Sequence, residues 1–431
     1  MRRVFAPDWF YADGAFHGNR AVVCEGGRII GVREPDSSEK VIRLAGRAML
    51  PGLVNAHSHA FQRSFRGTTE QRRDRRDDFW SWREAMYRAA GRLSTRDLYR
   101  VARMAFLEMA LSGITTVGEF HYIHGDEPNL IALEMVRAAR SVGLRICLLR
   151  VAYARAGFRR ELHPVQKRFI EASPDQFLRN IEALRSRLKD EYAWVGAAPH
   201  SVRAVPLDHL REVAAWAARE KVPLHMHVSE QPRELEESEA EYGLTPVMLL
   251  EREGILSPRF TAVHAIHLTA DEVRALADAG CTICACPTTE RNLGDGIVPA
   301  RALMDAGVRM ALGSDSQAQI ELLEDARELE YHLRLQNLER GLLDPESLLR
   351  AATEGGAASL EVPGDAADFF TVDLRDPSIA GIPIASMVSG IVFSASKSAV
   401  RDVIVGGEFV VRDGRHALAQ EIVDEFLAVP E

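Results

Sequence analysis

The chain has 431 residues, of which 46% are hydrophobic and 27% charged, and its formal net charge is −9 at pH 7. These values are ordinary for a globular protein, and the length suits one large domain with a smaller one beside it. The acidic balance gives no reason to expect a nucleic-acid partner, which usually requires a basic face. No apolar run of about 18 residues predicts a membrane span, and residues 1–8 lack the apolar core of a secretory signal, so we expect a cytoplasmic protein.

Both ends of the chain are rich in short β segments. Apolar runs bounded by Gly- or Asp-containing turns, the pattern of strands in a small sheet, occur at 21–24, 28–32, 369–374 and 400–407. Two β-rich ends that flank one long middle segment predict a single composite β domain. We place it at residues 1–50 plus 362–431.

The middle segment, residues 51–361, alternates between strand-like runs and longer amphipathic stretches such as 98–112 and 321–340. The eight strand-like runs lie near 48–56, 114–120, 144–152, 192–198, 222–228, 260–266, 281–286 and 308–314. Strands that alternate with helices predict parallel βα units, and eight of them predict an α/β protein with a (β/α)₈ TIM barrel. The alternative, an open doubly wound sheet, would need a Gly-rich phosphate turn after an early strand, and the sequence shows none.

Two histidines one residue apart, His57 and His59, follow the first strand-like run. Residues two apart in a strand point to the same face, so both imidazoles can reach one point beyond the strand end. A bare pair of this kind is more often two unrelated surface histidines. Here further candidate ligands follow at the ends of other strand-like runs, and this context favours a metal site.

Those further candidates are His227 at the end of the fifth run and Asp315 after the eighth. Barrel strands end at one common face, so their side chains are expected to meet there. Three nitrogens and one carboxylate oxygen suit Zn²⁺ best, with Fe²⁺ or Mn²⁺ as alternatives. His225 shares the strand face of His227 and competes as the ligand, but His227 lies closer to the strand end.

A carboxylate and another histidine follow the candidate ligands. Glu230 lies three residues beyond His227, where a carboxylate can carry a proton from water to a leaving nitrogen. His264 ends the sixth run, and either it or His267 is expected to orient the nucleophile. Asp315 is expected to assist in the same step.

Two other features receive a more ordinary interpretation. Cys281, Cys284 and Cys286 lie in a strand-like run without a second cysteine pair to complete a zinc site, so we interpret them as small buried hydrophobic side chains. The charged run at 71–78 is interpreted as a solvated loop. Its place after the first strand leaves a mobile lid as the alternative.

The arrangement of these motifs resembles the amidohydrolase superfamily, and within it the formimidoylglutamate deiminases. The superfamily resemblance rests on the His-x-His pair, the later His with Glu three residues on, the further His, and Ser-Asp after the last strand. The closer resemblance rests on the stretches His57 to Arg63, Phe79 to Glu84, Glu119 to Tyr122, Ala198 to Arg203 and Cys286 to Gly296.

The resemblance implies a zinc-dependent deiminase that converts N-formimidoyl-L-glutamate and water to N-formyl-L-glutamate and ammonia. It implies one zinc ion held by His57, His59, His227 and Asp315. It implies that Glu230 and His264 transfer protons, in preference to His267. The positions implied to bind substrate are Gln62, Arg83, Tyr122, His200 and Arg203. A homodimer is also an expectation from the resemblance.

The chemistry of the substrate agrees with two of these positions. Arginines bind carboxylates through a rigid two-pronged set of donors, and the expected small-molecule substrate carries two carboxylates. Arg83 and Arg203 follow different strands, so both can face the mouth of the barrel. The alternatives are another deaminase of the superfamily, acting on a nucleobase or nucleoside, and a non-catalytic scaffold, which would usually have lost ligands.

Overall fold

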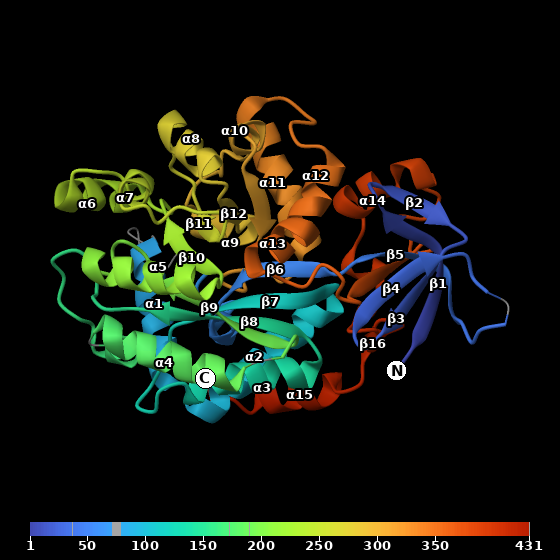
Figure 1. Ribbon diagram of the computed structural model, residues 1–431, viewed down its shortest axis with the longest axis horizontal. Helices are drawn as coiled ribbons and strands as arrows, with labels where there is room; N and C mark the ends of the chain where they lie inside the picture. The colour runs from blue at the N-terminus through green and yellow to red at the C-terminus, as the bar shows by residue number, and fades with distance from the viewer. Residues whose placement is uncertain (37, 71–78, 172, 189, 431) are drawn as a thin grey trace.

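The computed structural model describes residues 1–36, 38–70, 79–171, 173–188 and 190–430. A barrel of parallel strands surrounded by helices makes up the larger part, and a mixed sheet stands at one end of the molecule (Figure 1). Blue N-terminal strands and red C-terminal elements lie together at that end. The α/β class, the TIM-like barrel and the composite sheet are therefore confirmed.

Within the described residues, the barrel is an eight-stranded sheet whose strands follow one another in chain order. All its neighbouring strands are parallel. The strands are β6(Leu53–Ser58), β7(Ile114–His121), β8(Arg145–Ala152), β9(Ala193–Pro199), β10(Leu224–Val228), β11(Phe260–His264), β12(Thr282–Ala285) and β13(Arg309–Leu312). Each of the eight predicted strand-like runs overlaps one of them.

Helices follow the strands, and most of them cover the barrel from outside. Those up to the fifth strand are α1(Phe79–Arg92), α2(Thr95–Leu111), α3(Leu130–Val142), α4(Pro174–Arg187) and α5(Leu207–Glu220). The later ones are α6(Pro232–Tyr242), α7(Pro246–Arg252), α8(Ala270–Asp278), α9(Pro287–Leu293), α10(Ala300–Asp305), α11(Leu322–Asn337), α12(Pro345–Arg350), α13(Gly356–Leu360), α14(Met387–Phe393) and α15(Ala419–Leu427). The predicted helical stretches 98–112 and 321–340 correspond to α2 and α11.

The first and last barrel strands meet at their carboxyl ends. The backbone N–H of His59 donates to the carbonyl of Asp315 at 3.0 Å, and the N–H of Asp315 donates to the carbonyl of His57 at 3.0 Å. Gly313 allows this approach, because a Cβ there would lie 2.8 Å from the Cβ of His57. Closure of the barrel therefore brings His57 and His59, at the first strand, next to Asp315, which follows the last strand.

The opposite end of the barrel is filled by residues 351–360, a π-helical turn and α13. Gly355 packs against the backbone of Met310 in β13, and the carbonyl of Leu360 accepts a hydrogen bond from Trp194 in β9 at 2.8 Å. Because this segment contacts strands on both sides of the barrel, it closes the floor beneath the strand ends. Only the carboxyl face is left for a site, as is usual for this fold.

The mixed sheet has the strand order β17-β16-β15-β14-β5-β1-β3-β4, with β2 paired to β1. Its strands are β1(Arg3–Ala12), β2(Ala15–Gly18), β3(Ala21–Glu25), β4(Arg28–Arg33), β5(Ile42–Pro51), β14(Phe369–Asp373), β15(Val400–Val405), β16(Glu408–Arg412) and β17(Arg415–His416). Strand β5 joins the two chain ends, since it pairs parallel with β1 and antiparallel with β14. The predicted run 48–56 is thus two strands: its first part belongs to β5, and its second part is β6.

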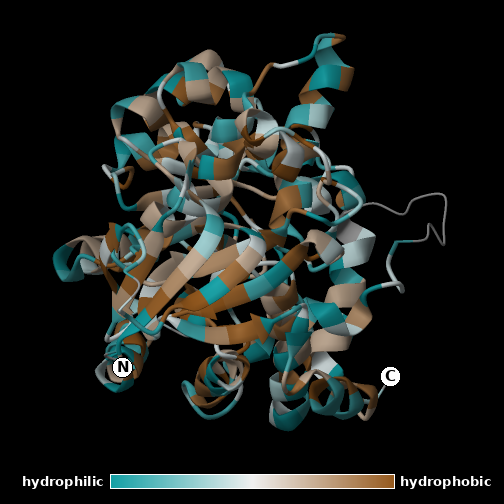
Figure 2. Ribbon diagram, turned by 90° about the vertical axis from the view of Figure 1, so that its right-hand side faces the viewer, coloured by the Kyte–Doolittle hydropathy of each residue, from teal (hydrophilic) through white to brown (hydrophobic). Residues whose placement is uncertain are grey.

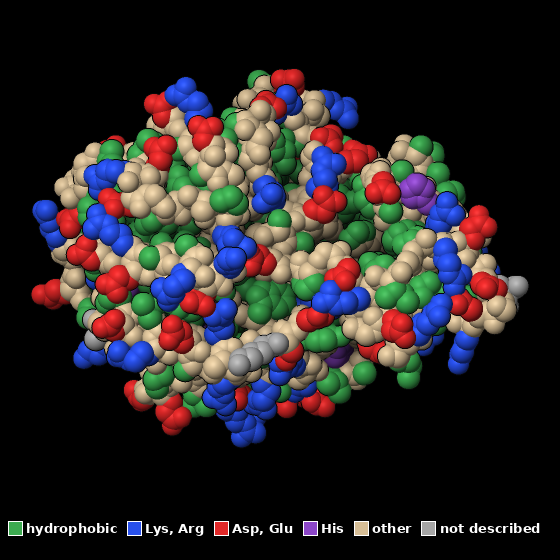
Figure 3. Space-filling model, viewed as in Figure 1, with side chains coloured by type: hydrophobic (Ala, Val, Ile, Leu, Met, Phe, Trp, Pro, Cys, Tyr) green, Lys and Arg blue, Asp and Glu red, His purple; other side chains and the backbone are tan. Residues whose placement is uncertain are grey.

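A buried ion pair connects this sheet to the barrel. The guanidinium of Arg145 in β8 contacts both carboxylate oxygens of Asp368, at 2.7 and 3.1 Å, and both side chains are buried. Figure 2 views the molecule from the side of the sheet, whose strands carry both hydrophobic and hydrophilic residues. On the face shown in Figure 3, acidic and basic side chains are interspersed. None of the described helices is both long enough and apolar enough to span a bilayer.

Candidate active site

Four side chains converge at the carboxyl end of the barrel. The Nε2 atom of His57 lies 3.2 Å from Nε2 of His59 and 3.2 Å from Nε2 of His227. One carboxylate oxygen of Asp315, Oδ1, lies 3.2 Å from Nε2 of both His57 and His59. The four potential ligand atoms lie within 4.8 Å of one another, and all four residues are buried. The structure thus brings together the four predicted ligands.

Strand geometry positions each of these groups. His57 lies near the end of β6 and His59 directly after it, whereas His227 lies in β10. Asp315 follows β13 with a φ angle of 42°, in the left-handed region, so its backbone conformation is strained. Strained backbone concentrates at functional sites, and here it places the Asp315 carboxylate over the barrel mouth.

Backbone carbonyls fix the orientation of two imidazoles. Nδ1 of His59 lies 3.0 Å from the carbonyl of Phe120, and Nδ1 of His227 lies 3.1 Å from the carbonyl of His200. A carbonyl accepts only, so each Nδ1 must carry the proton and donate. The lone pair of each ring is then on Nε2, which points into the cluster, as is usual for metal-binding histidines.

The charge states of the cluster also suit a metal ion. Burial lowers the pKa of His57 to about 3, and it lowers the pKa of His227 well below the usual value. Burial alone would raise the pKa of Asp315, but the imidazoles of His57 and His59, each 3.2 Å from its Oδ1, hold that pKa well below its usual range. Neutral imidazoles around an ionised carboxylate are the forms that coordinate a divalent metal. The residues present therefore fit the metal that the donor set predicts.

Buried polar groups support the backbone beneath the cluster. Glu119 in β7 accepts hydrogen bonds from the hydroxyl of Ser58 at 2.7 Å and from the N–H of Ala60 at 2.9 Å. The amide of Gln317 donates to Ser58 Oγ and to the carbonyl of Asp315, both at 2.9 Å. These contacts hold the two loops that carry the ligands against each other.

Glu230 and His264 lie beside the cluster, as predicted. Nε2 of His264 lies 3.7 Å from Oε1 of Glu230 and 3.9 Å from Oδ2 of Asp315. Its other nitrogen, Nδ1, lies 3.3 Å from Oε1 of Glu290. Burial alone would lower the pKa of His264, but the surrounding carboxylates, above all Glu230, raise it to about 10. The surrounding carboxylates therefore favour the protonated form of His264.

A cavity opens above the cluster, and all five residues predicted to contact substrate line it: Gln62, Arg83, Tyr122, His200 and Arg203. The amide of Gln62 donates to the hydroxyl of Tyr122 at 3.3 Å. Nη2 of Arg203 donates to Oε2 of Glu230 at 3.2 Å, so this arginine contacts the predicted proton carrier. The structure brings these residues to one cavity with the cluster, and their contacts with substrate stay a prediction.

Arg83 enters the cavity from α1 and is held by tyrosines. Its Nε donates to the hydroxyl of Tyr87 at 2.6 Å, and its Nη2 donates to the hydroxyl of Tyr153 at 2.9 Å. Gln166 donates to both hydroxyls, at 3.0 and 2.9 Å. This network fixes the guanidinium before a ligand arrives, which lowers the entropic cost of binding.

Other histidines and cysteines of the prediction lie outside the cluster. His225 is one layer lower in the barrel, where Nε2 lies 3.0 Å from the carbonyl of Ser359. His267 contacts the carbonyl of Asp295 at 3.0 Å. The five cysteines, which include Cys281, Cys284 and Cys286, are free and buried, as the interpretation of small hydrophobic side chains requires. The run 71–78 lies outside the described residues.

Sequence reasoning assigned no role to several residues of the site. Trp82, Met86 and Leu293 line the cavity. Glu290 contacts His264, and its Oε1 accepts the N–H of Cys286 at 2.8 Å. In the sequence, these residues are marked only by their position within or next to the motif stretches Phe79 to Glu84 and Cys286 to Gly296. Their distances to the cluster depend on the fold and could not be predicted.

The fold and the site together define a metal-dependent hydrolase built on a barrel. Residues 48–410 match the Amidohydrolase family. The chain is 35% identical to formimidoylglutamate deiminase from Pseudomonas aeruginosa, over 100% of this chain and 99% of that protein. It is 30% identical to 5-methylthioadenosine/S-adenosylhomocysteine deaminase from Pyrococcus furiosus, over 93% and 92% of the two chains.

A solved structure shows the same architecture. The crystal structure of atrazine chlorohydrolase from Arthrobacter aurescens complexed with zinc superimposes with a TM-score of 0.88, at 25% identity over 99% of each chain. The chain belongs to the amidohydrolase family, and it carries that family's buried metal site.

Proposed function

We propose that this protein hydrolyses N-formimidoyl-L-glutamate to N-formyl-L-glutamate and ammonia. The observation that carries the proposal is the presence of two arginines, the buried Arg203 and the partly buried Arg83, in the same cavity as the metal cluster. A substrate that carries two carboxylates and an amidine needs both features. The full-length similarity to formimidoylglutamate deiminase supports this choice.

Zinc is the metal that we propose for the cluster. Three imidazole nitrogens and one carboxylate oxygen are borderline-to-hard donors, which Zn²⁺ accepts readily, and Fe²⁺ or Mn²⁺ is the alternative. The similar atrazine chlorohydrolase is complexed with zinc. When bound, such an ion would lower the pKa of a coordinated water to about 7 and so supply a nucleophile at neutral pH.

Glu230 and His264 are the side chains that we assign to proton transfer and to orientation of the nucleophile. We assign Glu230 to accept the proton that the attacking water loses and to deliver it to the departing nitrogen. His264 Nε2 faces Glu230 and the second oxygen of Asp315, and we assign it to orient the attacking water. The new C–O bond forms at the formimidoyl carbon, the C–N bond to the terminal nitrogen breaks, and ammonia leaves.

We assign the two arginines to the carboxylates of the substrate. Each guanidinium can form charge-assisted hydrogen bonds with a carboxylate, which contribute roughly 1.5–3 kcal/mol each. Gln62, Tyr122 and His200 line the same cavity as the arginines and the cluster. We assign them to the glutamate backbone and the amidine, which must be held near the metal for attack.

Ammonia release by the zinc-loaded protein tests the proposal. The panel is formimidoylglutamate, S-adenosylhomocysteine, 5-methylthioadenosine, guanine and cytosine. We expect formimidoylglutamate to be hydrolysed with the highest kcat/KM. The similarity to a 5-methylthioadenosine/S-adenosylhomocysteine deaminase favours a nucleoside deaminase as the second candidate. Turnover of a nucleoside without turnover of formimidoylglutamate would establish that second function and refute the first.

A further inference from the structure

A second group of potential metal ligands lies beside the first. Within the part of the chain that the structure describes, two groups of at least three His, Cys, Asp or Glu side chains place their ligand atoms within 4.8 Å of one another. One is the metal cluster described above. The other consists of His264, Cys286 and Glu290, and all three residues are buried. The proposed function uses His264 but assigns no role to Cys286 or Glu290.

The three donors of this second group come from two neighbouring barrel strands. His264 is the last residue of β11, Cys286 directly follows β12, and Glu290 lies in the first turn of α9. Strands β11 and β12 pair in parallel, so their carboxyl ends lie side by side. Oε1 of Glu290 accepts the N–H of Cys286 at 2.8 Å, which fixes the carboxylate relative to the thiol. The fold itself therefore holds the donors together.

The spacing of the donors suits a metal ion. Nδ1 of His264 lies 3.3 Å from Oε1 of Glu290. Two ligand atoms of a tetrahedral zinc ion, with bonds of about 2.0–2.1 Å, lie roughly 3.3 Å apart. Sγ of Cys286 lies within 4.8 Å of the ligand atoms of both residues. A small shift of its side chain is enough for it to supply a third bond.

The charges around His264 also favour a cation there. Its Nε2 lies 3.7 Å from Oε1 of Glu230 and 3.9 Å from Oδ2 of Asp315, and its Nδ1 faces Glu290. Three carboxylates thus lie within 4 Å of one buried ring. Opposite charges at such distances attract strongly in a site from which water is excluded.

The thiol of Cys286 selects the kind of ion. Burial holds the pKa of this thiol well above its usual value, so the free side chain keeps its proton at neutral pH. An ion that binds there displaces the proton to solvent as the sulfur–metal bond forms. Thiolate is a soft ligand, which Zn²⁺ and Cd²⁺ bind well and Mg²⁺ does not. The first cluster contains no sulfur, so sulfur bonding distinguishes the two groups.

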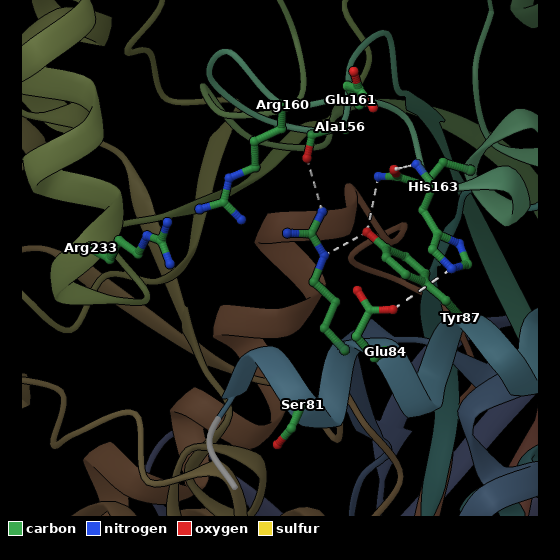
Figure 4. A pocket seen from close by; sticks show the side chains of 10 residues that line it. Ser81, Glu84, Tyr87, Ala156, Arg160, Glu161, His163 and Arg233 are labelled. Atoms are coloured by element: carbon green, nitrogen blue, oxygen red, sulfur yellow. Dashed lines mark hydrogen bonds and ion pairs between the residues drawn. The ribbon is translucent and has the colours of Figure 1, made fainter. Parts of the chain in front are cut away.

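The lining of a second cavity at this face offers a useful comparison. That cavity has a volume of about 360 Å³ and shares Arg83 with the metal cavity. In its lining, Nε2 of His163 lies 3.7 Å from Oε2 of Glu84. Figure 4 shows Glu161, the other carboxylate of the lining, away from both side chains. This pair contains two donors and no sulfur, so it does not meet the requirements of a closed zinc site.

We propose that Cys286, Glu290 and Nδ1 of His264 form a second metal site, which binds a thiophilic divalent ion such as Zn²⁺ or Cd²⁺ and inhibits the enzyme when it is filled. Inhibition follows because His264 belongs to both groups. An ion at Nδ1 takes hold of the side chain that we assign to orient the attacking water. The first metal ion thus activates the enzyme, and a second one, present in excess, stops it.

A titration with Cd²⁺ tests the site directly. Zinc-loaded wild type, Cys286→Ala and Cys281→Ala are titrated while the ultraviolet absorption of the cadmium–thiolate bond is recorded. Cys281→Ala is the matched control, because Cys281 is also buried but lies outside the second group. Wild type and Cys281→Ala are expected to show the absorption, and Cys286→Ala is expected to lack it. Circular dichroism verifies the fold, and elemental analysis verifies the zinc content.

Two results of this titration would overturn the proposal. One is the absence of thiolate absorption from wild type, and the other is absorption of wild-type size in folded Cys286→Ala. A second variant, Glu290→Gln, keeps the thiol in place and removes an anionic ligand. It is expected to weaken Cd²⁺ binding at least about 10-fold, since the loss of even an outer-shell partner costs 10- to 100-fold in metal affinity. An unchanged dissociation constant in Glu290→Gln would exclude that carboxylate and the site as proposed.

Inhibition of ammonia release by excess Zn²⁺ provides a second readout. The inhibition constant is expected to rise at least about 10-fold in Cys286→Ala and to stay at the wild-type value in Cys281→Ala and His163→Gln. Mg²⁺ at the same concentrations is expected not to inhibit. Equal inhibition constants in wild type and Cys286→Ala would contradict the proposal. Loss of inhibition in His163→Gln alone would assign the inhibitory ion to the second cavity instead.

The absorption titration separates this inference from the proposed function, because it requires no substrate. If wild type hydrolyses no formimidoylglutamate, the proposed function fails, and the titration still decides whether the second site exists. If wild type hydrolyses formimidoylglutamate but shows no cadmium–thiolate absorption, the second site alone is refuted.

Discussion

Arg203 Nη2 donates to Glu230 Oε2 at 3.2 Å, and its Nε lies 3.7 Å from Oε1 of the buried Glu234. The arginine that we assign to a substrate carboxylate therefore also holds the carboxylate that we assign to proton transfer. Arg83 instead donates to the hydroxyls of Tyr87 and Tyr153 and to the carbonyl of Ala156. The two arginines should differ in their kinetic roles.

Replacement of each arginine by methionine tests this difference. Arg83→Met removes a contact with substrate, so kcat/KM should fall by about 10- to 150-fold, mainly through KM. Arg203→Met should lower kcat as well, because Glu230 loses its partner. Steady-state kinetics of ammonia release measures both, and Arg88→Gln on the exposed side of α1 serves as the control. Equal kcat values in Arg203→Met and wild type would contradict the link to Glu230.

The two histidines of β10 should differ in metal binding. His227→Ala removes a ligand of the cluster, so the purified protein should lose most of its metal and at least about 100-fold in activity. His225→Gln is the matched comparison, since His225 is equally buried but contacts Ser359. It should keep its metal. Elemental analysis measures the metal content of both purified variants. Full metal occupancy in His227→Ala would exclude His227 as a ligand.

Glu230→Gln should leave the metal in place and impair the chemical step. The amide keeps the shape of the side chain but cannot accept a proton, and a positioned acid–base group contributes about 10²–10⁴-fold. We expect kcat to fall within that range, measured together with zinc content. Glu236→Gln, an exposed position of α6, is the control. A metal-replete Glu230→Gln enzyme with normal kcat would exclude Glu230 from proton transfer.

Asp325 should make stability depend on pH. This residue of α11 is fully buried, accepts the N–H of Thr288 at 3.0 Å, and has a pKa that burial raises to about 8. Its protonated form is favoured in the folded state, so its contribution to stability is complete below about pH 4 and is lost as the pH rises to about 8. Asp325→Asn cannot titrate and should not show this loss.

Urea unfolding at about pH 5 and about pH 8 measures the effect of Asp325. The free energy of unfolding of wild type, relative to Asp325→Asn, should decrease by about 1–4 kcal/mol between these pH values. Glu339→Gln, at an exposed position, should follow the wild-type dependence. A difference between wild type and Asp325→Asn that is constant with pH would show that Asp325 does not titrate in this range.

The strand-like runs and the predicted ligands could be identified from the sequence because their signals are local. Apolar runs bounded by polar residues indicate strands, and each candidate ligand lies at or near the end of one such run. The barrel order then follows from the alternation of strands and helices, which brings strand ends to one face. This is why His57, His59, His227 and Asp315 could be grouped before their distances were known.

Features that depend on contacts between distant segments could not be predicted in this way. Nothing local to residues 48–56 shows that Gly52 separates a strand of the mixed sheet from the first strand of the barrel. The contact of Arg203 with Glu230, the contact of Glu290 with His264, and the sharing of Arg83 by two cavities all join side chains from different strand–helix units.

The sequence by itself determined the fold class and the chemical nature of the site, because periodicity and donor atoms are properties of residue type and spacing. The tertiary structure decided which partner each side chain has. His225 and His227 have the same residue type and the same strand face, yet only His227 reaches the cluster, because His225 lies a layer lower and packs against α13. Layer depth in a closed barrel depends on strand stagger, which no local sequence pattern records.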